Sequence, residues 1–429
     1  MNAFNNPPQK SWKQLCARPN LSVAALDASV RDILARVKES GDEALKSLTL
    51  AFDKAKVDEL RVSPEEIMSA ASRLSYDLKS SIEVAAANIE KFHDAQKRER
   101  TIVETMQGVK CWRKAVPVEK VGIYIPGGSA PLFSTVLMLG IPAKLAGCRE
   151  VILCTPPDKM GYVNPAILFA AQLVGIDRVF RIGGAQAIAA MAFGTATVPR
   201  VYKIFGPGNQ FVTRAKQIVS EEGVAIDMPA GPSELLVIAD EFAEPSFIAA
   251  DLLSQAEHGE DSQVVLVVNE KVDIVRVQRE ISEQLRQLPR MAIAEKALAN
   301  SRIVTFASEE RAMDFVNAYA PEHLIINTKN AGILAEKVVN AGSVFLGGFS
   351  PESAGDYASG TNHTLPTNGY ARAYAGVSLE SFLKYITFQE ISADGLKLLG
   401  PVVEKMAEAE LLEGHKMAVR RRLEYLKTN

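Results

Sequence analysis

The chain lacks any apolar run long enough to cross a membrane. Its longest such stretches, for example PAILFAAQLVGI, are shorter than the about 20 residues that a spanning helix needs. Its beginning, MNAFNNPPQKSWK, contains no hydrophobic signal core. An excess of charge of one sign is also missing, because the net charge over 429 residues is -3. We therefore expect a cytoplasmic protein whose partner is a small molecule, with no nucleic acid and no membrane involved.

Cysteine is scarce as well, with four residues in the whole chain. Cys16, Cys111, Cys148 and Cys154 form no CxxC pair and lie in apolar or turn-rich segments, which favours reduced structural thiols. A catalytic thiol is the alternative interpretation, but no cysteine stands beside a histidine that could activate it.

The apolar pattern predicts an α/β protein. The first hundred residues have apolar positions at helical spacing, as in SVAALDASVRDILARVKESG, and a capping signal at Ser63. From Val121, short β-rich runs (VGIYI, EVILCT, RVFRI, RVYKIF) alternate with Ala-rich helical segments. A second such series (ELLVIA, QVVLVV, RIVTFA, HLIIN, SVFLGG) begins near Ser233. Alternation of this kind predicts parallel sheets covered by helices.

We expect four regions in a chain of this length. Residues 1–118 are predicted to form a helical N-terminal region that packs with the second α/β domain. The two α/β domains, at 119–232 and 233–376, are predicted as incomplete Rossmann-like parallel sheets separated near IDMPAGPS. Residues 377–429 are predicted as a helical tail that packs on its own chain or on a neighbouring one.

Three glycine-rich turns follow strands of the first series: Pro126-Gly127-Gly128, Gly183-Gly184 and Gly206-Pro207-Gly208. Each would let backbone N–H groups approach a phosphate at the start of a helix. None of them reads GxGxxG, and Asp158 is a poor match for the ribose-binding acid of that motif. Tight turns of any parallel sheet therefore explain the glycines as an alternative.

Three polar side chains nevertheless indicate a nucleotide. Tyr124, Gln186 and Asn209 stand at the carboxyl ends of expected strands, where ligands bind in open sheets. An aromatic face with two amides suits adenine or nicotinamide.

Histidine is also rare, with five residues in the chain, and two segments suggest a metal site. Gln255 and His258 are three residues apart on an expected helix and therefore share one face. Asp356, in a turn-rich GDY segment, adds a carboxylate that would be costly to bury alone. Nitrogen and oxygen donors without a thiolate suit a catalytic zinc ion. Helix and turn capping is the alternative for each residue taken singly.

The other histidines have different settings. Glu322 and His323 follow Pro321 and lead into an apolar strand, so that a carboxylate and an imidazole enter one cleft edge and could share proton transfer. His363, in SGTNHTLPT, suits either a substrate contact or a role in holding its loop. His93 lies on an amphipathic helix among Lys and Glu and is predicted to be at the surface.

Taken together, these tracts resemble the histidinol dehydrogenase family. VGIYIPGG, GGAQAIAA, FGPGN, IDMPAGPSE, DLLSQAEHG, APEHL, SAGDYASGTNH and EGHK follow one another in the family's order over nearly the whole chain. The resemblance implies an oxidoreductase of histidine biosynthesis that uses NAD and one Zn2+ per subunit. Its substrate would be L-histidinol, oxidised through L-histidinal to L-histidine. It also implies a homodimer with shared active sites.

The resemblance assigns roles by position. The implied zinc ligands, which also hold the substrate, are Gln255, His258, Asp356 and His415. The implied acid/base pair is Glu322 and His323, and His323 also contacts the substrate. Ser233 and Glu410 would be further substrate contacts, and Tyr124, Gln186 and Asn209 would contact NAD. It further suggests that Glu410 and His415 reach the neighbouring subunit's site. Gln210 and Thr361 depart from residues common in the family, but neither has one of these roles.

Three alternatives remain for the function. A zinc- and NAD-dependent relative could oxidise another polar alcohol, although Ser233 and Glu410 argue against that. The same ligand set could activate water in a zinc hydrolase whose glycine turns are merely structural. A non-catalytic binding protein with a structural metal is the third.

Overall fold

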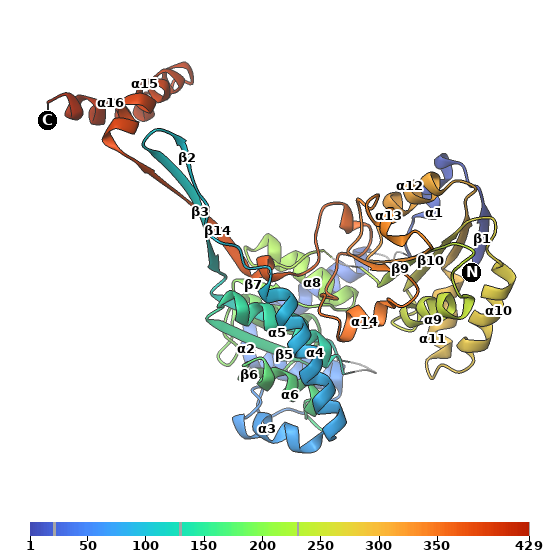
Figure 1. Cartoon of the computed structure of the whole chain (residues 1–429). Coiled ribbons are helices and arrows are strands. Elements are labelled where there is room, and N and C mark those ends of the chain that lie inside the picture. The colour runs from blue at the N-terminus through green and yellow to red at the C-terminus, as the bar shows by residue number, and fades with distance from the viewer. Residues whose placement is uncertain (20–22, 128–130, 230, 429) are drawn as a thin grey trace. The chain divides into compact units, whose positions relative to one another are not determined.

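The computed structural model describes residues 1–19, 23–127, 131–229 and 231–428. Gly128, in the first of the three glycine turns, lies outside the described residues. The chain forms two compact units: the first comprises Met1–Gln96 and Val118–Phe382, and the second comprises Lys97–Pro117 and Leu383–Asn429. Figure 1 gives the element labels used below.

The first sheet of unit 1 is parallel, with strand order β6-β5-β4-β7-β8. Its strands are β4 (Lys120–Tyr124), β5 (Glu150–Thr155), β6 (Arg178–Arg181), β7 (Lys203–Phe205) and β8 (Ala225–Ile226). The connecting helices are α5 (Phe133–Ala146), α6 (Pro165–Leu173), α7 (Gly184–Phe193) and α8 (Gln210–Glu221). In chain order the strands run 3-2-1-4-5, which matches the first five strands of the Rossmann order 3-2-1-4-5-6.

The second sheet of unit 1 repeats this order and adds one strand at its edge, giving β1-β11-β10-β9-β12-β13, again all parallel. Its strands are β1 (Asn2–Asn5), β9 (Glu234–Ala239), β10 (Gln263–Val268), β11 (Arg302–Thr305), β12 (His323–Asn327) and β13 (Ser343–Leu346). Two buried apolar clusters, one on each face, hold its helices. These are α9 (Pro245–Ala256), α10 (Ile274–Leu285) and α11 (Met291–Ala299) on one face, and α1 (Trp12–Leu15), α12 (Glu309–Tyr319) and α13 (Ala331–Ala335) on the other. The predicted α/β class with two parallel sheets is confirmed.

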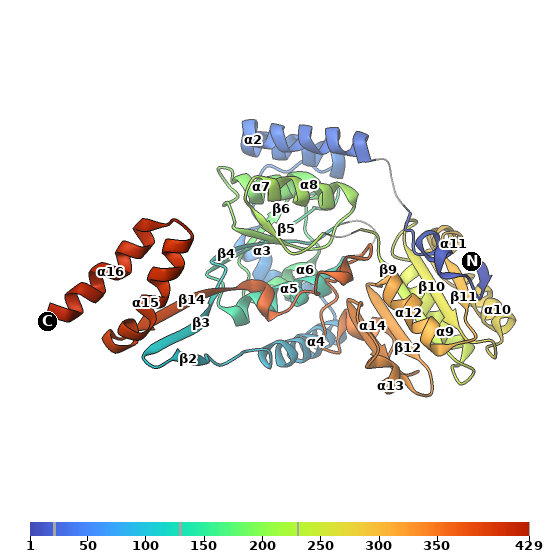
Figure 2. The same cartoon turned by 90° about the horizontal axis from the view of Figure 1, so that it is seen from above.

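The N-terminal residues do not pack as predicted. After β1, the short helices η1 (Gln9–Ser11) and α1 continue along the second sheet. However, α2 (Val23–Asp53), α3 (Pro64–Ser69), η2 (Ala70–Arg73) and α4 (Tyr76–Asp94) pack on the first sheet, so the expected packing with the second α/β domain is wrong for these helices. Figure 2 shows α2 beside α7 and α8. The physical reason is that α7 is apolar on all sides, so its outer face needs a covering helix.

The histidine of α4 is a second difference. His93, expected at the surface, is fully buried, and its Nδ1 lies 2.9 Å from the carbonyl oxygen of Ile89. The amide of Asn362 lies 3.4 Å from its Nε2. The helix is amphipathic, but a loop 269 residues further along the chain covers this position.

Short elements complete unit 1: α14 (Glu352–Tyr357), η3 (Tyr370–Arg372) and η4 (Leu379–Phe382). The four cysteines are free thiols. Among the helices of the described ranges, none combines the length and the apolar content that a membrane span requires.

Unit 2 is an antiparallel sheet followed by two helices. The sheet has the order β14-β3-β2, with β2 (Ile102–Met106), β3 (Val109–Pro117) and β14 (Leu383–Ile391); the helices α15 (Ala393–Ala409) and α16 (Glu413–Thr428) pack on each other. Residues 97–117 and 383–391 are therefore not helical, contrary to the prediction for the two ends of the chain. Aromatic and β-branched residues explain the strands: Trp112 and Phe388 face each other across β3 and β14, and their rings stack at 5.6 Å.

Candidate active site

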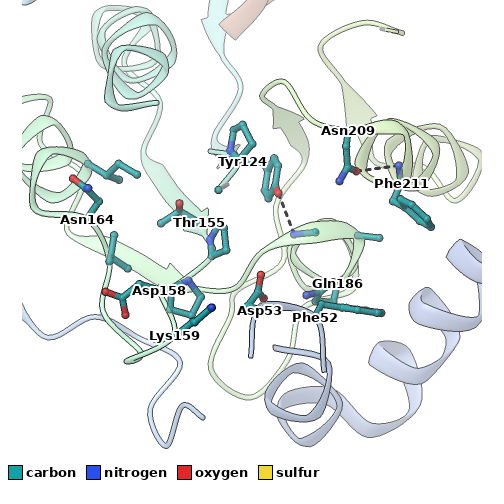
Figure 3. A pocket seen from close by; sticks show the side chains of 18 of the residues that line it. Phe52, Asp53, Tyr124, Thr155, Asp158, Lys159, Asn164, Gln186, Asn209 and Phe211 are labelled. Carbon is teal, nitrogen blue, oxygen red and sulfur yellow. Dashed lines mark hydrogen bonds between the residues drawn. The ribbon is translucent and has the colours of Figure 1, made fainter. Parts of the chain in front are cut away.

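A cavity of about 1480 Å3 lies at the carboxyl ends of the first sheet (Figure 3). Its walls include Tyr124 at the end of β4, Gln186 in the first turn of α7, and Asn209, the N-cap residue of α8. The strand order reverses between β4 and β7, and this is where a parallel α/β sheet opens a crevice for a ligand. The structure therefore brings the three predicted nucleotide-contact residues to one cavity.

The polar groups of this cavity are only partly used by the protein. The hydroxyl of Tyr124 accepts a hydrogen bond from the backbone N–H of Gly184 at 3.0 Å, and burial raises the pKa of this phenol, which keeps it protonated. The side chain of Asn209 accepts from the N–H groups of Phe211 and Val212 at 3.0 and 3.1 Å. Gln186 is buried, and its Nε2 has no partner among the described residues. The Tyr124 proton and the Gln186 amide are thus donors available to a ligand.

A second group of buried polar residues lies in the second sheet's half of unit 1, where the start of β12 meets helix α14. His323 begins β12, and its Nδ1 lies 3.7 Å from Glu322 Oε2 and 3.6 Å from Glu352 Oε1. Its Nε2 lies 3.4 Å from Asp356 Oδ1. The second oxygen atom of Glu322, Oε2, also accepts a hydrogen bond from the backbone N–H of Glu234 at 2.8 Å. The predicted acid/base pair is thus enclosed together with two carboxylates of α14.

Burial and mutual attraction shift the acidity of this group strongly. Burial alone would lower the pKa of His323, but attraction by Glu352 and Glu322 outweighs it and raises this pKa to about 10. Burial raises the pKa of Glu322 to about 8 and raises that of Glu352 as well. Burial also acts to raise the pKa of Asp356, but its interaction with His323 prevails and the pKa is lowered. The imidazole of His323 therefore interacts with three buried carboxyl groups. Groups whose pKa values are shifted in this way are typical of sites of proton transfer.

The predicted metal ligands of unit 1 show the unsatisfied polar atoms expected of a metal site. Gln255 is fully buried, and neither its Oε1 nor its Nε2 has a hydrogen-bond partner among the described residues. Burial lowers the pKa of His258, which favours the neutral imidazole that a metal ion needs. Asp356 Oδ1 is buried and, apart from its contact with His323, also unpartnered. An amide oxygen, a neutral imidazole and a carboxylate fit a zinc ion.

Two acidic residues of this region were missed in the sequence. Glu352 is fully buried, and one ligand atom each of His323, Glu352 and Asp356 lie within 4.8 Å of one another, so this trio could also hold a metal ion. Asp251 precedes Gln255 by one turn of α9 and is likewise buried. The spacing of four residues, from Glu352 to Asp356 and from Asp251 to Gln255, is the signal that could have found them.

The remaining predicted residues lie in different places. Ser233 is half-buried directly before β9, next to the residue whose N–H holds Glu322. Glu410 is the C-cap residue of α15 and His415 lies in the first turns of α16; both are exposed residues of unit 2.

His363 uses both of its ring nitrogens within the protein. Its Nδ1 lies 2.7 Å from the carbonyl oxygen of Asp356, and its Nε2 lies 3.0 Å from the hydroxyl of Thr135. Because a carbonyl can only accept, Nδ1 is the protonated nitrogen and Nε2 accepts from the hydroxyl. Of the two interpretations of His363, the structure favours the one in which it holds its loop.

A Rossmann-type parallel sheet that faces a large cavity, together with a buried Glu–His pair, is typical of an α/β enzyme. Comparison with known proteins places this enzyme among the oxidoreductases. Residues 16–423 match the family model described as histidinol dehydrogenase. The chain therefore belongs to the histidinol dehydrogenase family, as its motifs indicated.

The relatives are similar over their whole length. The chain is 57% identical over 427 residues to the histidinol dehydrogenase of Bacteroides thetaiotaomicron, with 100% of both chains covered. It is 55% identical over 417 residues to that of Vibrio cholerae, with 96% of both covered. The crystal structure of histidinol dehydrogenase from Elizabethkingia anophelis superposes with a TM-score of 0.97 at 56% identity, covering 100% of this chain and 99% of that one.

Proposed function

We propose that this protein oxidises L-histidinol through L-histidinal to L-histidine with NAD, and that a zinc ion holds the substrate. The observation that carries this proposal is the burial of Glu322 and His323 beside Asp356 in a member of the histidinol dehydrogenase family. The buried amide of Gln255, which has no hydrogen-bond partner among the described residues, supports it.

Gln255, His258 and Asp356 are the residues of unit 1 that would hold the zinc ion, and His415 is the proposed fourth ligand. When bound, zinc supplies a positive centre with positions open to the amine and imidazole nitrogens of the substrate, so that the reactive aldehyde stays in place between the two oxidations. The unpartnered amide of Gln255 and the lowered pKa of His258 support this assignment.

His323 is proposed to take the proton of the substrate hydroxyl in the zinc-loaded site, where the positive charge of the ion near Asp356 would oppose the rise in the pKa of the imidazole. Carboxylates lie near both of its ring nitrogens, Glu352 at Nδ1 and Asp356 at Nε2, and they would stabilise the imidazolium that forms. Glu322 is proposed to orient and deprotonate the water that hydrates the aldehyde. Its N–H partner, Glu234, fixes one carboxylate oxygen and leaves the other for this task.

The cavity at the first sheet is the proposed site of NAD, with Tyr124, Gln186 and Asn209 as contacts. When bound, NAD accepts the hydride in each of the two oxidations. The donors that the protein leaves unused there suit the carbonyl and hydroxyl oxygen atoms of a dinucleotide. Residues 119–232 would thus carry the cofactor, and residues 233–376 would carry the metal and the acid/base pair.

The last part of the proposal concerns the assembly. We propose a cytoplasmic homodimer in which Glu410 and His415 act in the partner's active site. Both are exposed residues of a separate compact unit, which supports a role outside their own fold. Ser233, beside the anchor of Glu322, would contact the substrate.

The deciding experiment measures NADH by its absorbance at 340 nm while L-histidinol is consumed by the zinc-loaded protein. We expect about two NADH per L-histidinol, since each oxidation reduces one NAD. One NADH per substrate would contradict the second oxidation. Turnover of other alcohols alone would indicate a relative with a different substrate, and no NADH with any alcohol would favour a hydrolase or a binding protein.

A further inference from the structure

The cavity at the first sheet contains a carboxylate whose function is unassigned. Asp53 is the last residue of α2, and its side chain lines the cavity. Figure 3 shows it between Gln186 on one side and the loop that carries Asp158 and Lys159 on the other. It thus lies at the open ends of the strands, although it comes from a helix that precedes the whole sheet in sequence.

In the described part of the chain, this carboxylate has an oxygen atom without a hydrogen-bond donor. Its Oδ2 is buried and has no hydrogen-bond partner among the described residues. Its Oδ1 faces the glycine turn, since a Cβ added to Gly183 would lie 3.3 Å from it. Burial raises the pKa of Asp53 to about 6. Arg36, Arg73 and Lys159 also line the cavity, but none of them forms an ion pair with Asp53 in the described part of the chain.

The acid found in the usual place uses one of its oxygen atoms to close its own turn. In dinucleotide-binding sheets an acidic residue after the second strand accepts hydrogen bonds from a ribose. Here the second strand is β5, and the acid that follows it is Asp158. Its Oδ1 accepts from the backbone N–H groups of Met160 and Tyr162 at 2.8 and 3.0 Å, and so closes its own turn. One carboxylate oxygen of Asp158 is therefore used within its own turn, whereas Oδ2 of Asp53 has no donor among the described residues.

We propose that Asp53 is the residue that accepts hydrogen bonds from the adenosine ribose of NAD and that disfavours NADP. This inference rests on the proposed function, because it requires a dinucleotide in the cavity. A carboxylate with no internal donor needs donors from its ligand, and the vicinal hydroxyl groups of ribose supply two. A 2′-phosphate in that place would bring a second anion against Asp53, which is electrostatically unfavourable in a partly desolvated cavity.

Two substitutions separate the contribution of Asp53 as a hydrogen-bond acceptor from the contribution of its charge. Asp53→Ala removes both charge and acceptor, whereas Asp53→Asn keeps one acceptor and removes the charge. Glu39→Gln is the matched control, because Glu39 is an exposed acid of the same helix and does not line the cavity. NAD and NADP are titrated separately into each zinc-loaded protein in a calorimeter, which measures binding without turnover.

We expect the Kd for NAD to rise by about tenfold to a hundredfold in Asp53→Ala, the loss typical of a hydrogen bond to a charged group. In Asp53→Asn, the ratio of the NADP and NAD dissociation constants should fall by about tenfold or more, because the repulsion is gone. Glu39→Gln should bind both cofactors like the wild type. Thermal unfolding checks the fold, and neither Asp53 variant should be less stable, since the carboxylate has no internal partner.

Two failures can be told apart. If the wild type bound neither cofactor, the proposed function itself would be wrong. If the wild type bound NAD and both Asp53 variants bound it equally well, only the role of Asp53 would be refuted. A weaker Kd for NAD with an unchanged preference over NADP would also overturn the inference, because the carboxylate would then serve a donor other than the adenosine ribose.

Discussion

Glu322 is a buried carboxyl group with two separable properties, its hydrogen bond and its charge. Glutamine in its place keeps an oxygen that can accept from the N–H of Glu234, so the fold should persist. It cannot take a proton from water, and loss of a general base costs about 10²- to 10⁴-fold in rate. Glu322→Gln should therefore slow the oxidation of L-histidinal by this factor and the oxidation of L-histidinol much less.

The two steps are measured separately by starting the reaction from the alcohol and from the aldehyde. A circular dichroism spectrum like that of the wild type serves as the control for folding. Equal loss in both steps would show that Glu322 does not act on the hydrating water.

Asp251 makes stability depend on pH. It is buried, and burial raises its pKa to about 7, whereas an unfolded chain has a carboxyl pKa of about 4. The folded state thus resists ionisation of Asp251, and its contribution lowers stability as pH rises from about 4 through 7. Asp251→Asn should therefore unfold at a higher temperature than the wild type at pH 8, and at a similar temperature at pH 4.

Thermal unfolding of the zinc-free protein at the two pH values measures this effect. Glu295→Gln, which replaces an exposed acid of α11, should change neither value appreciably. The explanation fails if Asp251→Asn gains no more stability at pH 8 than at pH 4.

The chemistry of single residues was partly readable in the sequence. Gln255 and His258 were proposed as zinc ligands because residues three apart share one face of a helix, and Asp356 was added for its carboxylate in a turn-rich segment. Asp53 and Glu352 were not found, since what distinguishes them is burial without a partner, and partners depend on the tertiary fold. His93 was misplaced for the same reason, because the loop that covers it is distant in sequence.

Among the elements, the turn after β7 passes close to the end of β4, where Tyr124 lines the cavity. Gly206 has φ 130°, and a Cβ there would collide with the carbonyl oxygen of Tyr124 at the end of β4. Gly147, the C-cap residue of α5, also has a positive φ of 83°, but a Cβ there would meet nothing within 4 Å. Substitution of Gly147 would thus report the cost of backbone strain alone, and substitution of Gly206 would report strain together with a steric clash.

Gly147→Ala should cost roughly 1–2 kcal/mol, the penalty of a left-handed backbone for an L-residue. Gly206→Ala should cost clearly more, because it must also push β4 and β7 apart. Urea unfolding of both variants gives the comparison, and NAD titration of Gly206→Ala should show weaker binding. Equal free energies of unfolding would mean that the contact with Tyr124 has no consequence.

Helices and strands with a clear apolar pattern were predicted well. Strands that form only because a distant strand pairs with them were not. Nine of the eleven strands described in the two parallel sheets correspond to apolar runs that the sequence shows directly, with β1 and β8 as the exceptions. The edge strand β1 carries the sequence NAFN, and only its register with β11 makes it a strand. The strands of unit 2 are defined by the antiparallel pairing of β3 with β2 and with β14, which is distant in sequence. Their residue types suit strands, but the spacing of apolar residues did not indicate them.

At the scale of the whole molecule, the proposed zinc ligands are divided between the two units. Gln255, His258 and Asp356 belong to unit 1, and His415 belongs to unit 2. His415 was reached only through the family resemblance, because one exposed histidine on a polar helix has no local signature of a ligand. A ligand set divided in this way permits sharing between two subunits of a symmetric dimer, in which each chain would complete the other's site.

Mixing two variants that each fail to complete the conversion to L-histidine tests that sharing. In Glu322→Gln the acid/base pair is defective, and in His415→Asn the proposed fourth zinc ligand is missing. If His415 acts in the partner's site, a mixed dimer has one site with both defects and one site with none. Equal amounts that reassociate at random form mixed dimers half of the time, so about a quarter of the wild-type activity should return.

If His415 instead acts within its own chain, every site of the mixed dimer carries one defect and no activity returns. Each variant is put through the same dissociation and reassociation alone as a control, and native mass spectrometry verifies that mixed dimers form. Zinc analysis of His415→Asn alone should show depleted metal. Mixed dimers that are present but inactive would place the complete site within one chain, and they would leave the roles of Glu322 and His323 in that site intact.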